Sequence, residues 1–118
     1  MNIHLGTDNF DLKPKVKAYA QTKIGGLEKY LPRNARGSSA KITLGEDQSG
    51  REDNRYYCEV IINVPNATLQ SKEATLNMYA AIDIVEAKIK TQIIKYKSKQ
   101  QSTRSGRLRK LLGRQRDI

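Results

Sequence analysis

Lysines near the C-terminal end of the sequence recur at spacings that place them on two flanks of one helix. At about 100° per residue, Lys88, Lys95 and Lys99 fall together on one flank. Lys90 and Lys97 fall together on the other flank. Ammonium groups in this arrangement suit polyanion binding, because each can contact a phosphate of a nucleic-acid backbone without reading its bases. We therefore interpret the segment as a phosphate-binding surface.

The distribution of charge supports this interpretation. The 118 residues carry 22 Lys and Arg against 12 Asp and Glu, a formal net charge of +10. Nine basic residues and one acidic residue lie between Lys95 and Ile118, which leaves 13 basic and 11 acidic residues in the rest of the chain. A single lysine usually only solvates a helix, but like charges at this density cost stability unless a polyanion neutralises them. Such a chain attracts nucleic acid or an anionic membrane.

The sequence contains few residues suited to catalysis or metal binding. His4 is the one histidine and has no partner for acid–base or metal chemistry. Cys58 is the one cysteine, so it forms no internal disulfide or zinc site, and we expect it to be a small buried residue on a strand. Glu46, Glu52 and Asp53 lie in a polar loop, a poor support for paired-carboxylate catalysis. We expect no enzyme, no cofactor, no metal ion and no small-molecule substrate.

The elements that must position the lysines follow from the apolar pattern. Alternation predicts strands, and apolar residues every three or four positions predict helices. One domain suits this chain length, and two helices on one face of a four-stranded sheet is the economical packing. We predict an α+β fold of order β-α-β-β-β-α in residues 1–100, followed by a flexible basic tail in 101–118. The expected strands are residues 2–6, 40–44, 55–64 and 67–72, and the expected helices are 12–31 and about 75–99.

Two details of the helices stay open in the sequence. Gly25 and Gly26 interrupt the first helix at a cost of roughly 1 kcal/mol each against Ala, so we expect a continuous but weak helix or one that frays after Ile24. Thr75 and Asn77 are both suitable N-caps for the second helix. The expected core-facing residues are Leu12, Val16, Ala20, Ile24, Leu27 and Leu31 in the first helix and Met78, Ile82, Val85, Ile89, Ile93 and Tyr96 in the second.

The tail has two interpretations. It can be a disordered basic arm that binds any RNA. Alternatively, Leu108, Leu111 and Leu112 can form one amphipathic turn against a protein or lipid surface. No apolar run reaches the length of a membrane span, and the N-terminus lacks the basic-then-apolar pattern of a signal peptide. We therefore expect a cytoplasmic protein with no membrane partner.

The sequence resembles the ribosome hibernation promoting factors, also called protein Y or ribosomal subunit interface proteins, in two segments. The first is Asp11-Leu12-Lys13-Pro14, which leads into a helix that closes with Gly26-Leu27-Glu28-Lys29-Tyr30. The second and more specific is Asn77-Met78-Tyr79-Ala80-Ala81-Ile82-Asp83, followed by a basic helix. The resemblance covers about residues 2–100 in order and without large gaps.

This resemblance implies a domain shaped like double-stranded-RNA-binding domains. It also implies binding to the small ribosomal subunit, in the channel where mRNA and the A- and P-site tRNAs lie, and the silencing of idle ribosomes. The family's rRNA-contacting helix positions fall on Lys23, Lys29, Lys88, Lys95 and Lys99. With the other lysines of the helix and two tail arginines, the predicted rRNA-binding set is Lys23, Lys29, Lys88, Lys90, Lys95, Lys97, Lys99, Arg104 and Arg107.

The sequence departs from the family pattern in three places. Gly25-Gly26 stand where helix-favouring and often basic residues are usual. Thr91 stands where a basic residue is common, with Lys90 beside it as a candidate replacement. The tail is basic, whereas one branch of the family ends in an acidic tail and another continues into a dimerisation domain. We expect a protein that is monomeric off the ribosome and does not pair two ribosomes through a domain of its own.

The leading hypothesis is therefore a translation-silencing factor, and two alternatives remain. A general double-stranded-RNA-binding protein would bind any A-form duplex with equal affinity. A membrane-surface or protein-interaction module would act through Leu108–Leu112 and lose its function when residues 103–118 are deleted. DNA is not an expected partner.

Overall fold

The order of the elements is the predicted one. The computed structural model describes the backbone of residues 1–49 and 51–116, and the side chains of these residues apart from 52 and 100–116. Short 3-10 helices, η1 (Gly26–Tyr30), η2 (Arg33–Ala35) and η3 (Glu52–Asn54), lie in the connections. The main elements are β1 (Asn2–Asp8), α1 (Pro14–Gly25), β2 (Ser39–Glu46), β3 (Tyr56–Val64), β4 (Ala67–Thr75) and α2 (Met78–Arg116).

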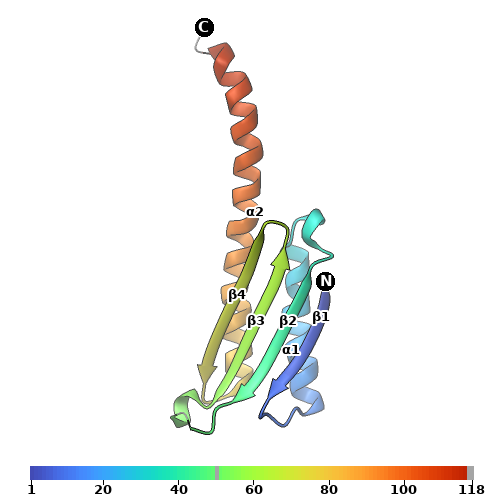
Figure 1. Ribbon diagram of the computed structural model, residues 1–118, viewed down its shortest axis with the longest axis vertical. Coiled ribbons are helices and arrows are strands. Elements are labelled where there is room, and N and C mark those ends of the chain that lie inside the picture. Colours follow the sequence, from blue (N-terminus) through green and yellow to red (C-terminus); the bar gives the residue numbers. More distant parts are fainter. Residues whose placement is uncertain (50, 117–118) are drawn as a thin grey trace.

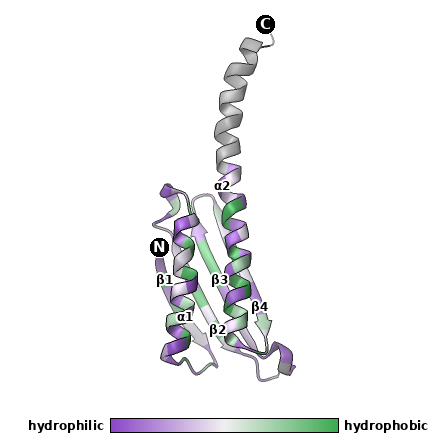
Figure 2. Cartoon of the chain, turned by 180° about the vertical axis from the view of Figure 1, so that it is seen from behind, coloured by the Kyte–Doolittle hydropathy of each residue, from purple (hydrophilic) through white to green (hydrophobic). Residues whose placement is uncertain are grey.

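The four strands form one mixed sheet in the order β1-β2-β3-β4. β1 runs parallel to β2, and the β2–β3 and β3–β4 pairs are antiparallel. Figures 1 and 2 show α1 and α2 side by side on one face of this sheet, with the opposite face uncovered. The predicted α+β fold, with both helices on one face, is confirmed.

Alternation along β3 explains how the sheet acquires one buried face. Cys58, Val60 and Ile62 have no solvent-exposed surface, whereas Tyr57 and Glu59 point to the uncovered face and are half-buried. Burial raises the pKa of the Cys58 thiol to about 12, with a further contribution from the charge of Glu59. The thiol is therefore protonated and unreactive at neutral pH, as expected for a structural residue on a strand.

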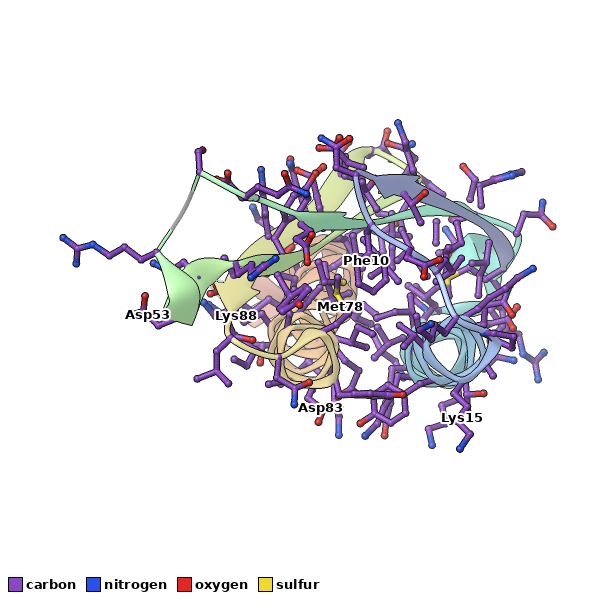
Figure 3. The ribbon with its side chains drawn as sticks, turned by 90° about the horizontal axis from the view of Figure 1, so that it is seen from below. Phe10, Lys15, Asp53, Met78, Asp83 and Lys88 are labelled. Carbon is purple, nitrogen blue, oxygen red and sulfur yellow. The ribbon has the colours of Figure 1, made fainter. Side chains whose placement is uncertain are left out.

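Both helices bury the predicted apolar stripes. Every expected core-facing residue of the two helices is buried except Leu12, which is half-buried and packs against the core. Met78, at the start of α2, points into the space between the helices and the sheet (Figure 3). Among the described residues, no helix combines the length and the apolar character that a bilayer crossing requires.

The two glycines change the form of the first helix without interrupting it. The α-helix ends at Gly25 and the chain continues to Tyr30 as a 3-10 helix, an outcome between the two that the sequence allowed. A Cβ on Gly25 would lie 3.3 Å from Cδ1 of Ile3, so this glycine lets the helix approach β1 closely. A Cβ on Gly26 would meet nothing within 4 Å, which leaves open space beside η1.

Of the two expected capping residues, Asn77 caps the N-terminus of α2, and Thr75 bonds to Asn77. Oδ1 of Asn77 accepts a hydrogen bond from the Tyr79 amide at 2.8 Å, and Oγ1 of Thr75 accepts one from the Asn77 amide at 3.0 Å. Since the free amides of a first turn need such acceptors, the helix begins at Met78 rather than near Thr75. β4 correspondingly runs to Thr75, beyond its predicted end at residue 72.

The C-terminal end of α2 lies further along the chain than predicted. The helix continues to Arg116, not to about Lys99. No proline follows Pro65. Every residue after Lys99 therefore has the main-chain N–H that a helix interior requires. The flexibility expected for residues 101–118 stays a prediction, and its last two residues lie outside the described part of the chain.

Candidate nucleic-acid interface

The lysines of α2 lie on two opposite flanks of the helix. Nζ of Lys88 pairs with Oε1 of Glu73 on β4. Lys90 points the other way, and its Nζ lies 4.6 Å from the ring centroid of Tyr30 in η1. Figure 3, seen along the helices, shows Lys88 on the side of α2 towards the sheet. With 100° per residue, the β4 flank carries Lys88, Lys95 and Lys99, and the α1 flank carries Lys90 and Lys97.

The α1 flank brings lysines from both helices together. Two adjacent hollows, of about 250 and 320 Å³, lie between the α1–η1 segment and α2, and we call them together the inter-helix groove. Lys29 and Tyr30 line both hollows, so they divide the groove into two parts. The first hollow is completed by Tyr19, Thr22, Lys23, Gly26 and Glu86, and the second by Ile94, Lys97 and Ser98.

Tyr30, which lines both hollows, has two lysines over its ring. Nζ of Lys29 lies 5.2 Å and Nζ of Lys90 4.6 Å from its ring centroid, within the range of cation–π attraction. A hydrogen bond from Lys90 lowers the pKa of the Tyr30 hydroxyl below its ordinary value, and Lys29 adds to the effect. Tyr30 was not among the predicted site residues. Its position directly after Lys29 was the available signal, since RNA-binding grooves combine aromatic rings with basic side chains.

Asp83 joins the two helices at the other end of the groove. The Tyr19 hydroxyl donates a hydrogen bond to Oδ1 of Asp83 at 2.5 Å, and Nζ of Lys23 lies 3.6 Å from the same oxygen. The bond to Asp83 raises the pKa of Tyr19 to about 12, so the hydroxyl stays protonated at neutral pH. The Tyr19 ring also meets Tyr79 edge-on, with centroids 5.0 Å apart. Lys23 is thus partly neutralised within the fold.

The β4 flank also contains a lysine whose charge is paired within the fold. Lys88 is bound to Glu73, and Gln92 makes two hydrogen bonds to the main chain of Gln70, accepting from N at 2.9 Å and donating to O at 2.7 Å. These bonds satisfy groups that an edge strand otherwise exposes. Lys95 remains an exposed lysine on this flank. The assignment of the β4 flank to rRNA stays a prediction.

An uncharged surface separates the two flanks. It faces away from the sheet and includes the exposed side chains of Ile84, Ala87, Thr91 and Ile94. The Thr91 hydroxyl bonds to the Ala87 carbonyl within the helix. Lys90 is turned towards the α1 side and does not occupy the outer position of Thr91. The lysines of α2 therefore form two separate rows, not one continuous basic face.

The remaining predicted site residues are placed as follows. Arg104 and Arg107 belong to α2, but their side chains lie outside the described part of the structure. His4 is exposed on β1. Within the described side chains, no three His, Cys, Asp or Glu residues gather closely enough to hold a metal ion.

Comparison with known protein families shows to which family this chain belongs. Residues 3–101 match the model of the family described as sigma 54 modulation protein / S30EA ribosomal protein. The chain belongs to this family. The resemblance inferred from the two sequence segments is thereby confirmed, over nearly the range that those segments indicated.

Curated relatives of this S30EA-family chain carry a functional name. The ribosome hibernation promotion factor of Lactococcus lactis subsp. cremoris is 30% identical over 99 residues, which cover 84% of this chain and 51% of the relative. The protein of the same name from Bacillus subtilis is 29% identical over 99 residues and is covered to 50% of its length. The chain therefore spans about half the length of these relatives.

Solved structures show the same fold. The N-terminal domain of Thermus thermophilus Protein Y superposes with a TM-score of 0.68 at 23% identity, covering 81% of this chain and 99% of that domain. A ribosomal subunit interface protein from Coxiella burnetii gives a TM-score of 0.66 at 21% identity, covering 83% of this chain and 99% of that protein. At these identities the similarity establishes the fold alone.

Proposed function

We propose that this S30EA-family chain is a ribosome hibernation factor. It binds the small ribosomal subunit in the channel of mRNA and of the A- and P-site tRNAs, and it inhibits translation in idle ribosomes. The shared name of its curated relatives supports this function. The observation that carries it is the inter-helix groove, where Lys29, Lys90 and Lys97 gather without an acidic partner among the described residues.

The mechanism is steric and needs no bond to be broken. Ammonium groups of the groove contact phosphates of rRNA, and each contact releases counterions, so the affinity falls as salt rises. Lysine contacts of this kind hold a backbone in register and leave its sequence unread. The folded domain then occupies space that mRNA and tRNA need. The protein acts by binding in the cytoplasm, where ribosomes work.

The test is co-sedimentation of the purified chain with isolated small ribosomal subunits, with and without excess duplex RNA. Saturation near one chain per subunit that duplex RNA does not displace supports the proposal. Weak, non-saturating binding that duplex RNA removes would overturn it in favour of a general double-stranded-RNA-binding protein.

A second measurement tests the location on the subunit. Subunits already loaded with mRNA and P-site tRNA are expected to bind the chain much more weakly than empty ones, because the occupied channel excludes it. Equal binding to loaded and empty subunits would place the contact elsewhere. Deletion of residues 103–118, with anionic vesicles as the ligand, tests the remaining alternative of a tail that binds membranes.

A further inference from the structure

The two hollows of the inter-helix groove differ in chemistry. The second hollow is basic, because Lys29 and Lys97 line it and Lys90 lies over the Tyr30 ring at its edge. The first hollow is lined by Lys23 and Lys29 as well, but it also contains a carboxylate, that of the half-buried Glu86. Among the described residues Glu86 has no ion-pair or hydrogen-bond partner. No side-chain oxygen in the described part of the chain is both buried and without a partner, so the Glu86 oxygens are open to solvent and can accept hydrogen bonds from a ligand.

The walls of the first hollow are suited to a flat ring. Tyr19 and Tyr30 line it, and Gly26 contributes no side chain. A Cβ at Gly26 would meet nothing within 4 Å, so the space beside this residue is open. Aromatic rings of this kind pack against nucleobases in many RNA-binding sites.

We propose that the inter-helix groove binds a single unpaired nucleotide of RNA. Its base lies in the first hollow against the Tyr30 ring, with its N–H edge on the Glu86 carboxylate. Its phosphate lies on the other side of Tyr30, on Lys29, Lys90 and Lys97. This inference rests on the proposed function and names the part of the RNA that the groove recognises.

The same geometry indicates which base binds best. The N–H edge of a base is free only when the base is unpaired. Guanine presents two adjacent N–H donors, which match the two oxygens of a carboxylate. Adenine presents an acceptor beside its amino group, which a carboxylate repels. Guanine is therefore preferred over adenine at this position.

The experiment measures fluorescence anisotropy of labelled uridine heptamers that carry one central guanine or one central adenine. The wild-type chain is expected to bind the guanine oligomer about tenfold more tightly, the discrimination that one bidentate base contact provides. Glu86→Gln is expected to remove this preference, because an amide offers one acceptor oxygen, not two, while phosphate binding is retained.

A second variant fills the first hollow and leaves every charge in place. Gly26→Leu is expected to weaken binding of both oligomers by about tenfold, the loss of one stacked base. Gly37→Leu is the matched control, because a Cβ at Gly37 also meets nothing within 4 Å and this residue lies outside the groove. It is expected to bind both oligomers as the wild-type chain does.

Equal affinity of the wild-type chain for the two oligomers overturns this inference, as does wild-type binding by Gly26→Leu. The proposed function fails separately, if the wild-type chain does not saturate small subunits in co-sedimentation. A chain that discriminates guanine but ignores the subunit would support the nucleotide site and overturn the ribosomal proposal.

Discussion

Neutralising two lysines of the inter-helix groove tests whether the groove contacts phosphates. The double variant Lys29→Gln and Lys97→Gln removes two exposed ammonium groups that have no acidic partner among the described residues. Each phosphate contact contributes about 0.7 to 0.9 to the slope of log K against log salt concentration. The slope for subunit binding is therefore expected to fall by about 1.4 to 1.8. Over a tenfold rise in salt concentration, the affinity of the variant is therefore expected to fall about 25- to 60-fold less than the affinity of the wild-type chain.

The assay is equilibrium binding to small ribosomal subunits over a series of salt concentrations. The matched control is the double variant Lys17→Gln and Lys41→Gln, which makes the same change in net charge at exposed residues outside the groove. Urea unfolding of both variants checks that the fold is intact, and little change is expected because all four side chains are exposed.

Two results would each refute this prediction. If both double variants lower the slope by the same amount, only the total charge matters and the groove has no special role. If neither variant changes the slope, lysine–phosphate contacts at these positions do not contribute to binding.

Three further predictions concern the fold, two of them beside the groove and one on the uncovered face of the sheet. Tyr19→Phe is expected to lower the free energy of unfolding by at most about 1 kcal/mol, because its bond to α2 is partly exposed. The pKa of Tyr19 in the folded protein is raised from 10.0 to about 12. The stabilisation by this bond is therefore complete below about pH 10 and disappears as the pH rises to about 12. The free energy of unfolding in urea should consequently differ less between about pH 9 and pH 11 in the variant than in the wild-type chain. Gly26→Ala is expected to raise the free energy of unfolding by about 0.5 to 1 kcal/mol, because Ala favours the helical conformation and its Cβ meets open space; an unchanged urea midpoint would contradict this. Gly45→Ala is expected to displace the Tyr57 ring, which lies 2.2 Å from the position of the added Cβ, and to break the hydrogen bond that Tyr57 donates to Asp8 at 2.6 Å. The pKa of Tyr57, raised to about 12 mainly by that bond, should then return towards 10.0 in an NMR titration.

The two rows of lysines on α2 are stabilised in different ways. On the β4 flank, Lys88 is paired with Glu73. On the α1 flank, Lys90 lies against the Tyr30 ring, and a ring face attracts a cation without neutralising its charge. The α1 flank thus keeps its charge available for a polyanion. This difference makes the inter-helix groove the better candidate interface of the two.

Much of the fold was predictable because its signals are local. Alternation in β3 follows from the two-residue period of a strand, and the apolar stripe of α2 follows from the 3.6-residue period of a helix. Both periods are properties of the backbone, so they are readable from neighbouring residues. The division of the lysines of α2 into two rows has the same origin. The end of α2 at Arg116 was not predictable in this way, because polar residues are compatible with both helix and coil.

The sequence by itself determined the α+β fold, the family and the flank of α2 on which each lysine lies. Tertiary structure alone decided which lysines keep their charge available. Lys88 meets Glu73 across 15 residues and Lys23 meets Asp83 across 60 residues of chain, whereas Lys90 meets Tyr30 in the groove. Such partners come together only when helices and strands pack, and their spacing in the sequence has no period that would reveal them.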